Sequence, residues 1–335
     1  MHLLRTAAAL AAALALAAPA DVAADPGQLD QPAHHPRSFV GSDGTTYASA
    51  PLTVPGRDGE LYYGPDFDVA CGLGSATSRT MTQIAKLGHV IERSGRTLVW
   101  TVAPNKSTVR PQNLPDPMPH GVCDARGFEQ GRRVLDRLTG RNFLPLRARL
   151  TRSPRQTYFK TDTHWTTVGG SIFARALAKR LAPRVAQLQS YAYGTEQRVG
   201  NLNFFDGNMV LETAETATPT TKVTTRTAAI SADQVWSGYP QLTFDYTWNA
   251  RPARRTVPGD TVILGDSFSM FALDSLMPLF QRGRFLWRGK LAERVEFQAI
   301  KRADTVVIEV AEVDAPLGSP LADSGYRKRL KRALR

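Results

Sequence analysis

Apolar side chains along the chain repeat with helical spacing in some segments and form short unbroken runs in others. Over residues 78–94 the apolar positions recur at spacings of three and four, which predicts an amphipathic helix. They are Met81, Ile84, Leu87, Val90 and Ile91. Residues 96–103 form an aliphatic and aromatic run that stops at Pro104, and this predicts a buried strand that follows the helix.

The same alternation of strand and helix returns near the C-terminal end. The predicted strands are 261–264, 285–287 and 305–311, and the predicted helices are 270–280 and 291–300. Further helices are predicted over residues 128–138 and, with Thr166 or Thr167 as N-cap, through Leu181. Aliphatic strands that alternate with helices are typical of a largely parallel sheet covered on both faces, so the predicted fold class is α/β.

Three segments depart from this pattern. Residues 25–55 are rich in Pro, Gly, Asp and His, which predicts a flexible N-terminal arm, with order beginning near Gly59. Residues 187–258 are rich in Thr and aromatic residues, which predicts a β-rich insertion. Residues 316–335 form a basic C-terminal tail. The remainder, residues 56–315, is predicted to be one catalytic domain, and 335 residues suffice for a sizeable core.

The first 24 residues predict a signal for export. Arg5 precedes an Ala/Leu run, and the small residues 22–24 resemble a signal-peptidase site. An uncleaved anchor is the alternative, but the run is much shorter than the roughly 20 apolar residues that span a bilayer. We therefore expect a secreted or extracytoplasmic protein, in the periplasm or at the cell surface.

Net charge and cysteine content limit which binding partners, disulfides and metal sites we expect. The formal net charge is +12, which outside the cytoplasm favours an anionic polysaccharide, a teichoic-type polymer or acidic lipid over nucleic acid, although a solvated basic surface is the simpler alternative. Cys71 and Cys123 most simply form one disulfide in an exported protein. No histidine shows zinc spacing with a cysteine or an acidic residue, so neither a metal nor a cofactor is expected.

A hydroxyl nucleophile is predicted where the strand 261–264 ends. Gly265, Asp266 and Ser267 follow that strand directly, and residues just past the carboxyl ends of such strands face a crevice. Ser269 is the rival hydroxyl. Taken alone, this tripeptide is more often a turn with an N-cap. A base elsewhere in the chain supports its interpretation as a nucleophile.

That base is predicted to be His164. A serine hydroxyl needs an imidazole to take its proton, and Asp162, two residues earlier, could accept the imidazole N–H and fix its tautomer. The alternative is that Asp162 caps the next helix while His164 packs. Trp165 could form the wall of a pocket or belong to the core.

Asn105 and Lys106 follow the strand 96–103 and are candidates for substrate or oxyanion contact. A turn asparagine is the simpler interpretation of Asn105. Nucleotide binding is excluded at this loop because the Gly-x-x-x-x-Gly-Lys frame of a phosphate loop is absent before Ser107.

Five motifs together resemble the alginate O-acetyltransferase family, the exported SGNH-type proteins related to AlgX and AlgJ. They are GRDGELYY at Gly56, APNKSTVRPQNLP at Ala103, KTDTHWT at Lys160, LGDSFS at Leu264 and DTVVIEVAE at Asp304. The resemblance implies a permuted SGNH-like domain in which Ser267 is the nucleophile, His164 the base and Asp162 its orienting carboxylate. It also implies acetyl transfer to a polysaccharide, with a membrane-bound acyltransferase as donor.

Two other functions fit the same residues. A carbohydrate acetylesterase would use the same triad and differ only in letting water attack the acyl-serine. A non-catalytic glycan-binding or assembly protein would keep the fold without the activity. For polymer contact the sequence offers many arginines and the aromatic residues of the insertion, namely Trp236, Tyr239, Tyr246 and Trp248.

Overall fold

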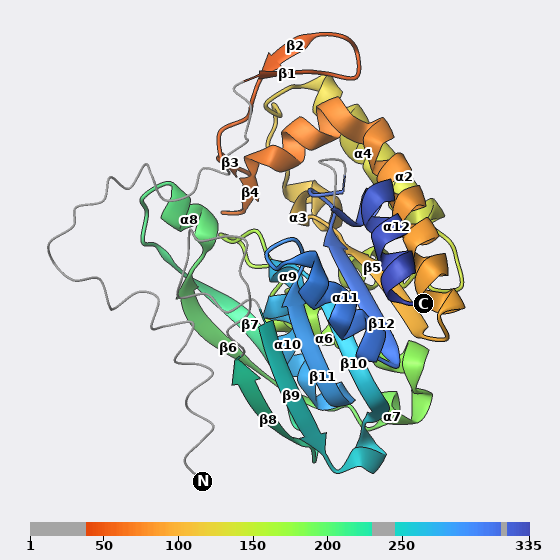
Figure 1. Cartoon of the computed structure of the whole chain (residues 1–335). Coiled ribbons are helices and arrows are strands. Elements are labelled where there is room, and N and C mark those ends of the chain that lie inside the picture. The colour runs from red at the N-terminus through yellow and green to blue at the C-terminus, as the bar shows by residue number, and fades with distance from the viewer. Residues whose placement is uncertain (1–37, 230–244, 316–319) are drawn as a thin grey trace, which may run out of the picture. The chain divides into compact units, whose positions relative to one another are not determined.

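A computed structural model describes residues 38–229, 245–315 and 320–335 of the chain (Figure 1). The predicted signal peptide, the first part of the predicted arm, and Trp236 and Tyr239 lie outside these residues. Among the residues described, no helix is both long and apolar enough to cross a lipid bilayer.

A six-stranded sheet with the order β5-β12-β10-β11-β9-β8 forms the centre of the protein. Its strands are β5 (Thr97–Ala103), β8 (Thr224–Ala229), β9 (Asp245–Arg251), β10 (Val257–Gly265), β11 (Phe280–Trp287) and β12 (Thr305–Ala311). The four strands from β5 to β11 are parallel, whereas β9 and β8 continue the sheet in antiparallel fashion. The predicted α/β class with a largely parallel sheet is confirmed.

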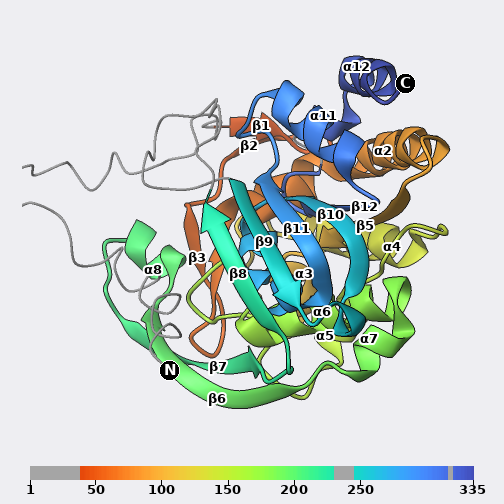
Figure 2. The ribbon, with the colours of Figure 1, turned by 60° about the horizontal axis from the view of Figure 1, so that its bottom comes forward.

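Helices cover both faces of this sheet (Figure 2). The longer ones are α2 (Gly64–Arg93), α4 (Val122–Arg137), α6 (Thr167–Leu181), α11 (Glu293–Arg302) and α12 (Ser324–Ala333). Side chains of β10 alternate between two cores, because Ile263 packs with α6 whereas Val262 and Leu264 pack with α2, α11 and α12. This double covering explains the aliphatic runs within the parallel strands, such as residues 262–264 of β10 and 306–308 of β12.

The predicted insertion divides into two parts with different roles. β6 (Tyr191–Val199) and β7 (Leu211–Pro219) pair as a separate antiparallel ribbon, joined by the short helix α8 (Asn201–Phe205). In contrast, β8 and β9 belong to the main sheet. Trp248 of β9 is 1% exposed and so is not available to a polymer, whereas Tyr246 packs against the same core and is half-buried.

Order begins earlier than the sequence predicted. β1 (Ser38–Val40) pairs with β2 (Thr46–Ala48), and β3 (Thr53–Pro55) pairs with β4 (Leu61–Tyr63), so the second part of the predicted arm is structured. The predicted disulfide between Cys71 and Cys123 is present, and it joins α2 to α4.

Two further predictions were wrong. The helix expected over residues 270–280 is divided into α9 (Ser267–Phe271), α10 (Leu273–Leu276) and the 3-10 turn η4 (Met277–Leu279). Pro278 cannot continue a regular helix, and this accounts for the end of α10. The expected C-terminal tail is the amphipathic helix α12, whose Tyr326 and Leu330 are buried in the core.

Candidate active site

The proposed nucleophile lies at the carboxyl edge of the sheet. β10 ends at Gly265, Asp266 forms the turn, and Ser267 begins α9 with a half-buried side chain. A Cβ at position 265 would lie 2.3 Å from Ser269 Oγ and 3.1 Å from Glu309 Oε2. Only glycine therefore allows the strand to pass so close to the first turn of α9.

A buried carboxyl group on β12 holds this turn in shape. Glu309 Oε2 accepts hydrogen bonds from the backbone N–H groups of Asp266 and Ser269, both at 3.2 Å, and from Ser269 Oγ at 2.8 Å. Burial, followed by the negative charge of Asp266, raises the pKa of the Glu309 carboxyl well above its usual range. Ser269 is fully buried and bound to this group, which removes it as the rival nucleophile.

Asp266 fixes the other side of the turn. Its Oδ1 accepts from the N–H of Phe268 at 3.0 Å, as an N-cap does, and its Oδ2 accepts from Ala311 N at 2.9 Å and from Arg288 at 3.1 Å. The buried Arg288 guanidinium and the end of β12 therefore anchor the residue that precedes Ser267.

The predicted base and its carboxylate meet in one tight loop. His164 Nδ1 lies 2.7 Å from Asp162 Oδ1, and the backbone N–H of His164 donates to the same oxygen at 2.9 Å. Burial alone would raise the pKa of Asp162, but the charge and hydrogen bonds of His164 and the Arg198 guanidinium outweigh it and hold that pKa well below its usual range. Asp162 is thus an ionised carboxylate aimed at the imidazole.

The β6–β7 ribbon holds this loop from outside. Arg198 on β6 donates to Asp162 Oδ2 at 3.0 Å, and the N–H of Asn201 donates to the same atom at 3.1 Å. Glu212 on β7 accepts from the N–H groups of Lys160 and Thr161 at 2.7 and 3.0 Å. The ribbon therefore positions the loop that carries the proposed base.

Helix α9 carries both Ser267 and the phenyl ring on which the imidazole stacks. The His164 ring stacks on Phe271 with centroids 4.3 Å apart and lies 5.0 Å from the Phe268 ring. Ser267 and Phe271 are four residues apart on this helix and so share one face. Among the hydrogen bonds of the described residues none joins Ser267 to His164, and such catalytic bonds often form only when substrate is bound.

Trp165 and Lys106 are buried and hold the fold together around the site. Trp165 is fully buried, and its Nε1 donates to the carbonyl of Phe268 at 2.9 Å, which ties the His164 loop to α9. Lys106 is 2% exposed, and its ammonium donates to the carbonyls of Phe159, Lys160 and Asp162 at 2.7 to 3.0 Å. Burial lowers the pKa of Lys106 to about 8 although nearby carboxylates oppose this. As a substrate contact Lys106 is therefore a wrong prediction.

Asn105 remains the best side-chain candidate for an oxyanion donor. It follows β5, two strands from β10 on the same edge of the sheet, and its Oδ1 accepts from Val313 N at 3.1 Å. Its amide nitrogen has no partner among the described residues. The backbone of this turn offers few free donors, because the N–H groups of Phe268 and Ser269 are bound to Asp266 and Glu309. At this turn Ser267 N–H is the remaining one within the described structure.

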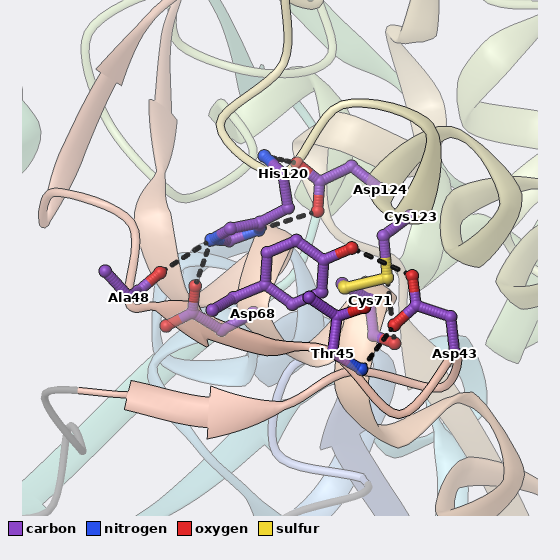
Figure 3. Close-up of a disulfide and its surroundings, with 9 residues drawn as sticks. Asp43, Thr45, Ala48, Asp68, Cys71, His120, Cys123 and Asp124 are labelled. Atoms are coloured by element: carbon purple, nitrogen blue, oxygen red, sulfur yellow. Dashed lines mark hydrogen bonds and ion pairs between the residues drawn. A yellow bond between two sulfur atoms is a disulfide. The ribbon is translucent and has the colours of Figure 1, made fainter.

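A second polar cluster surrounds the disulfide, away from this site (Figure 3). His120 contacts Asp124 Oδ1 through Nδ1 at 2.9 Å and the Ala48 carbonyl through Nε2 at 3.0 Å. Cys71, His120 and Asp124 are close enough to hold a metal ion, but the Cys71 sulfur is committed to the disulfide. This cluster joins the β1–β2 hairpin to α4.

Arg198 and Glu309 were missed at the sequence level. Arg198 lies in a strand that reads as solvent-exposed, and only the folded ribbon places it beside Asp162. Glu309 is a lone acidic residue within an aliphatic strand, and a charged residue buried at such a position is a signal that could have been used.

Known proteins share this fold and parts of this sequence. A family model described as the SGNH hydrolase-like domain of the acetyltransferase AlgX matches residues 53–239, more than half of the chain. A probable alginate O-acetylase AlgJ from Pseudomonas fluorescens is 25% identical over 163 residues, which cover 46% of this chain and 41% of that relative. The match thus spans less than half the length of that protein.

Two solved structures support the fold alone. Bacillus cereus PatB1, solved with a sulfonyl adduct, matches with a TM-score of 0.57 at 15% identity, over 81% of this chain and 99% of its own. A DHHW family protein from Eubacterium siraeum matches with a TM-score of 0.50 at 13% identity, over 83% of this chain and 98% of its own. The family match confirms the resemblance predicted from the sequence: the chain belongs to the AlgX/AlgJ-like family of SGNH hydrolase-like acetyltransferase domains.

Proposed function

We propose that this protein transfers acetyl groups to hydroxyls of a polysaccharide outside the cytoplasm, through an acyl-enzyme on Ser267. The main support is the pairing of His164 with the ionised, buried Asp162 beside the helix that begins at Ser267. Family membership supports the acetyl group and the polysaccharide class, and the predicted export signal supports the location.

In the first half-reaction His164 Nε2 takes the proton of Ser267 Oγ while Oγ attacks the acyl carbonyl of the donor. The tetrahedral oxyanion is stabilised by Ser267 N–H and the Asn105 amide. His164 then gives the proton to the leaving group of the donor, and the acetyl group remains on Ser267 as an ester.

In the second half-reaction a glycan hydroxyl attacks the acetyl-serine. His164 takes the proton of that hydroxyl and returns it to Ser267 Oγ as the ester bond to serine breaks. Asp162 stays ionised throughout and stabilises the imidazolium, because Arg198 and Asn201 N–H occupy its second oxygen. The donor is expected to be a membrane-bound acyltransferase partner, since acetyl-CoA is not available outside the cytoplasm.

The test follows both possible fates of the acetyl group. The protein is incubated with an activated acetyl ester and a soluble oligosaccharide, and acetylated sugar and free acetate are quantified by mass spectrometry. Acetylated sugar that disappears in Ser267→Ala supports the proposal. Free acetate alone, also dependent on Ser267, would assign a carbohydrate acetylesterase. Neither product, with sugar binding retained, would assign a glycan-binding protein.

A further inference from the structure

A stripe of positive charge runs along the outer side of α2. Arg79, Lys86 and Arg93 are exposed and lie seven residues apart, so they line up along the helix at intervals of about 10.5 Å. The opposite side of α2 is buried against the sheet through Met81, Ile84, Leu87 and Ile91. The stripe therefore faces away from the core along half of a 30-residue helix.

Helix α12 adds a second row of cations beside the first. The two helices lie side by side (Figure 1). Arg327 donates to Gln83 of α2 at 2.7 Å, and Tyr326 and Leu330 pack into the same core as α2. The exposed side of α12 carries Lys328, Lys331 and Arg332, and the helix contains no acidic residue. We call these six residues of α2 and α12 the basic face.

The charges of the basic face are not neutralised by the surrounding protein. In the described parts of the chain none of the six forms an ion pair. The nearby acids Glu92 and Glu293 are engaged elsewhere, with Arg141 at 3.1 Å and with Arg329 at 2.6 Å. The face therefore attracts anions, and salt weakens that attraction.

Helix α2 runs between the two edges of the sheet, and the stripe lies on the half of the helix farther from the proposed active site. The first turn of α2 lies at the carboxyl edge of the sheet, because Asp66 accepts a hydrogen bond from Ser107, just past β5, at 2.9 Å. The last turn lies at the opposite edge, where Arg96 precedes β5 and donates to the carbonyl of Ile300 at 2.7 Å. A chain bound along α2 would extend toward the edge that carries Ser267.

We propose that the basic face binds an anionic polysaccharide and leads it toward the carboxyl edge of the sheet. A row of cations at regular intervals on α2, with a second row beside it on α12, suits a linear polyanion with repeated charges. A lipid surface fits less well, because peripheral membrane contact also needs apolar side chains that insert. The large apolar residues that are most exposed lie elsewhere, as on α8 and β7, and none is on the described parts of α2 or α12. The link to acetylation rests on the proposed function.

The experiment compares two charge-matched triple variants. The first variant combines Arg79→Gln, Lys86→Gln and Arg93→Gln on α2. The control combines Lys179→Gln, Arg180→Gln and Arg184→Gln. These exposed cations lie near the end of α6 and just beyond it, on the other face of the sheet. Binding of polygalacturonate is measured by calorimetry at several salt concentrations, with dextran as the neutral polymer. We expect affinity to fall at least about tenfold in the α2 variant. The slope of log affinity against log salt concentration should become shallower by roughly 1 to 2. The control should stay within about twofold of the wild type.

Three results would overturn the proposal. They are an equal loss of affinity in both variants, no binding of polygalacturonate by the wild type, and binding of phosphatidylglycerol vesicles by the wild type instead of polygalacturonate. Turnover of a small acetyl ester separates this proposal from the proposed function. The α2 variant should retain that turnover, because its substitutions lie outside the site. Polymer binding by a protein without ester turnover would support the basic face and contradict the proposed function alone.

Discussion

Arg198 offers the sharpest test of how the catalytic loop is held. Its guanidinium lies 3.0 Å from Asp162 Oδ2 and stacks over the Phe159 ring at 4.1 Å. Replacing it with Gln removes the cation that faces the second oxygen of a carboxylate only 1% exposed. Asp162 Oδ1 would then no longer be reserved for His164, and the imidazole would lose its orientation.

The expected loss follows from burial. Breaking a fully buried ion pair costs about 3 to 5 kcal/mol, and an exposed pair is worth at most about 1 kcal/mol. The Arg198 side chain is 26% exposed, and Asp162 keeps the N–H groups of His164 and Asn201. We therefore expect a loss of about 2 kcal/mol of transition-state stabilisation, or roughly 30-fold in kcat/KM.

The assay is steady-state turnover of a small acetyl ester, where the loss should fall on kcat and leave KM nearly unchanged. Arg198→Lys keeps the charge and should recover part of the activity, as should added methylguanidinium with Arg198→Ala. Arg155→Gln is the matched control, since Arg155 pairs with Glu215 and stacks on Tyr193 of the same ribbon, away from Asp162. Full activity in Arg198→Gln, or an equal loss in Arg155→Gln, would refute this reasoning.

Three more predictions concern the turn, the buried acids and the disulfide. Glu309→Gln keeps an acceptor for the turn before α9 and should retain ester turnover, whereas Glu309→Leu should lose it by more than about tenfold, because buried donors stay unpaired; equal activity of the two variants would contradict this. Burial raises the pKa of Glu312 to about 7. The contribution of Glu312 to stability therefore falls as pH rises from the pKa of the unfolded chain, near 4.5, through about 7. In urea titrations the wild type should lose stability relative to Glu312→Gln between pH 5 and pH 8, by at most roughly 3 kcal/mol. The same difference in stability between wild type and Glu312→Gln at both pH values would disprove this pH dependence. Serine at Cys71 and Cys123 should lower the free energy of unfolding by about 4 kcal/mol for a bridge across 52 residues, and an unchanged urea midpoint would disagree.

The parallel strands β5, β10 and β12 were predictable because burial on both faces requires continuous aliphatic runs, whereas β8 and β9 were predicted only as part of a β-rich insertion. Thr305–Ala311 and Thr97–Ala103 appear in the sequence as such runs and form β12 and β5. The first half of α2 was not predictable by the same means. Asp66 and Asp68 are buried polar residues in its first turns, and they interrupt the apolar pattern that marks a helix.

The proposed site was predictable only where residues are neighbours in sequence. Asp162 and His164 share a loop, so their pairing follows from spacing. Arg198 reaches Asp162 only because the β6–β7 ribbon folds over that loop, and tertiary contact of this kind leaves no local pattern. The helix α12 did carry a signal, since Tyr326 and Leu330 are four residues apart, but its many cations obscured it.

Acetylation of Ser267 is the most direct test of the proposed mechanism. The wild type and His164→Ala are exposed to an activated acetyl ester without a sugar, quenched in acid and digested, and the peptide that contains Ser267 is analysed by mass spectrometry. An acetyl group on Ser267 in the wild type, and little or none in His164→Ala, is the predicted result. An unmodified Ser267 in an enzyme that still consumes the ester would contradict the acyl-serine mechanism.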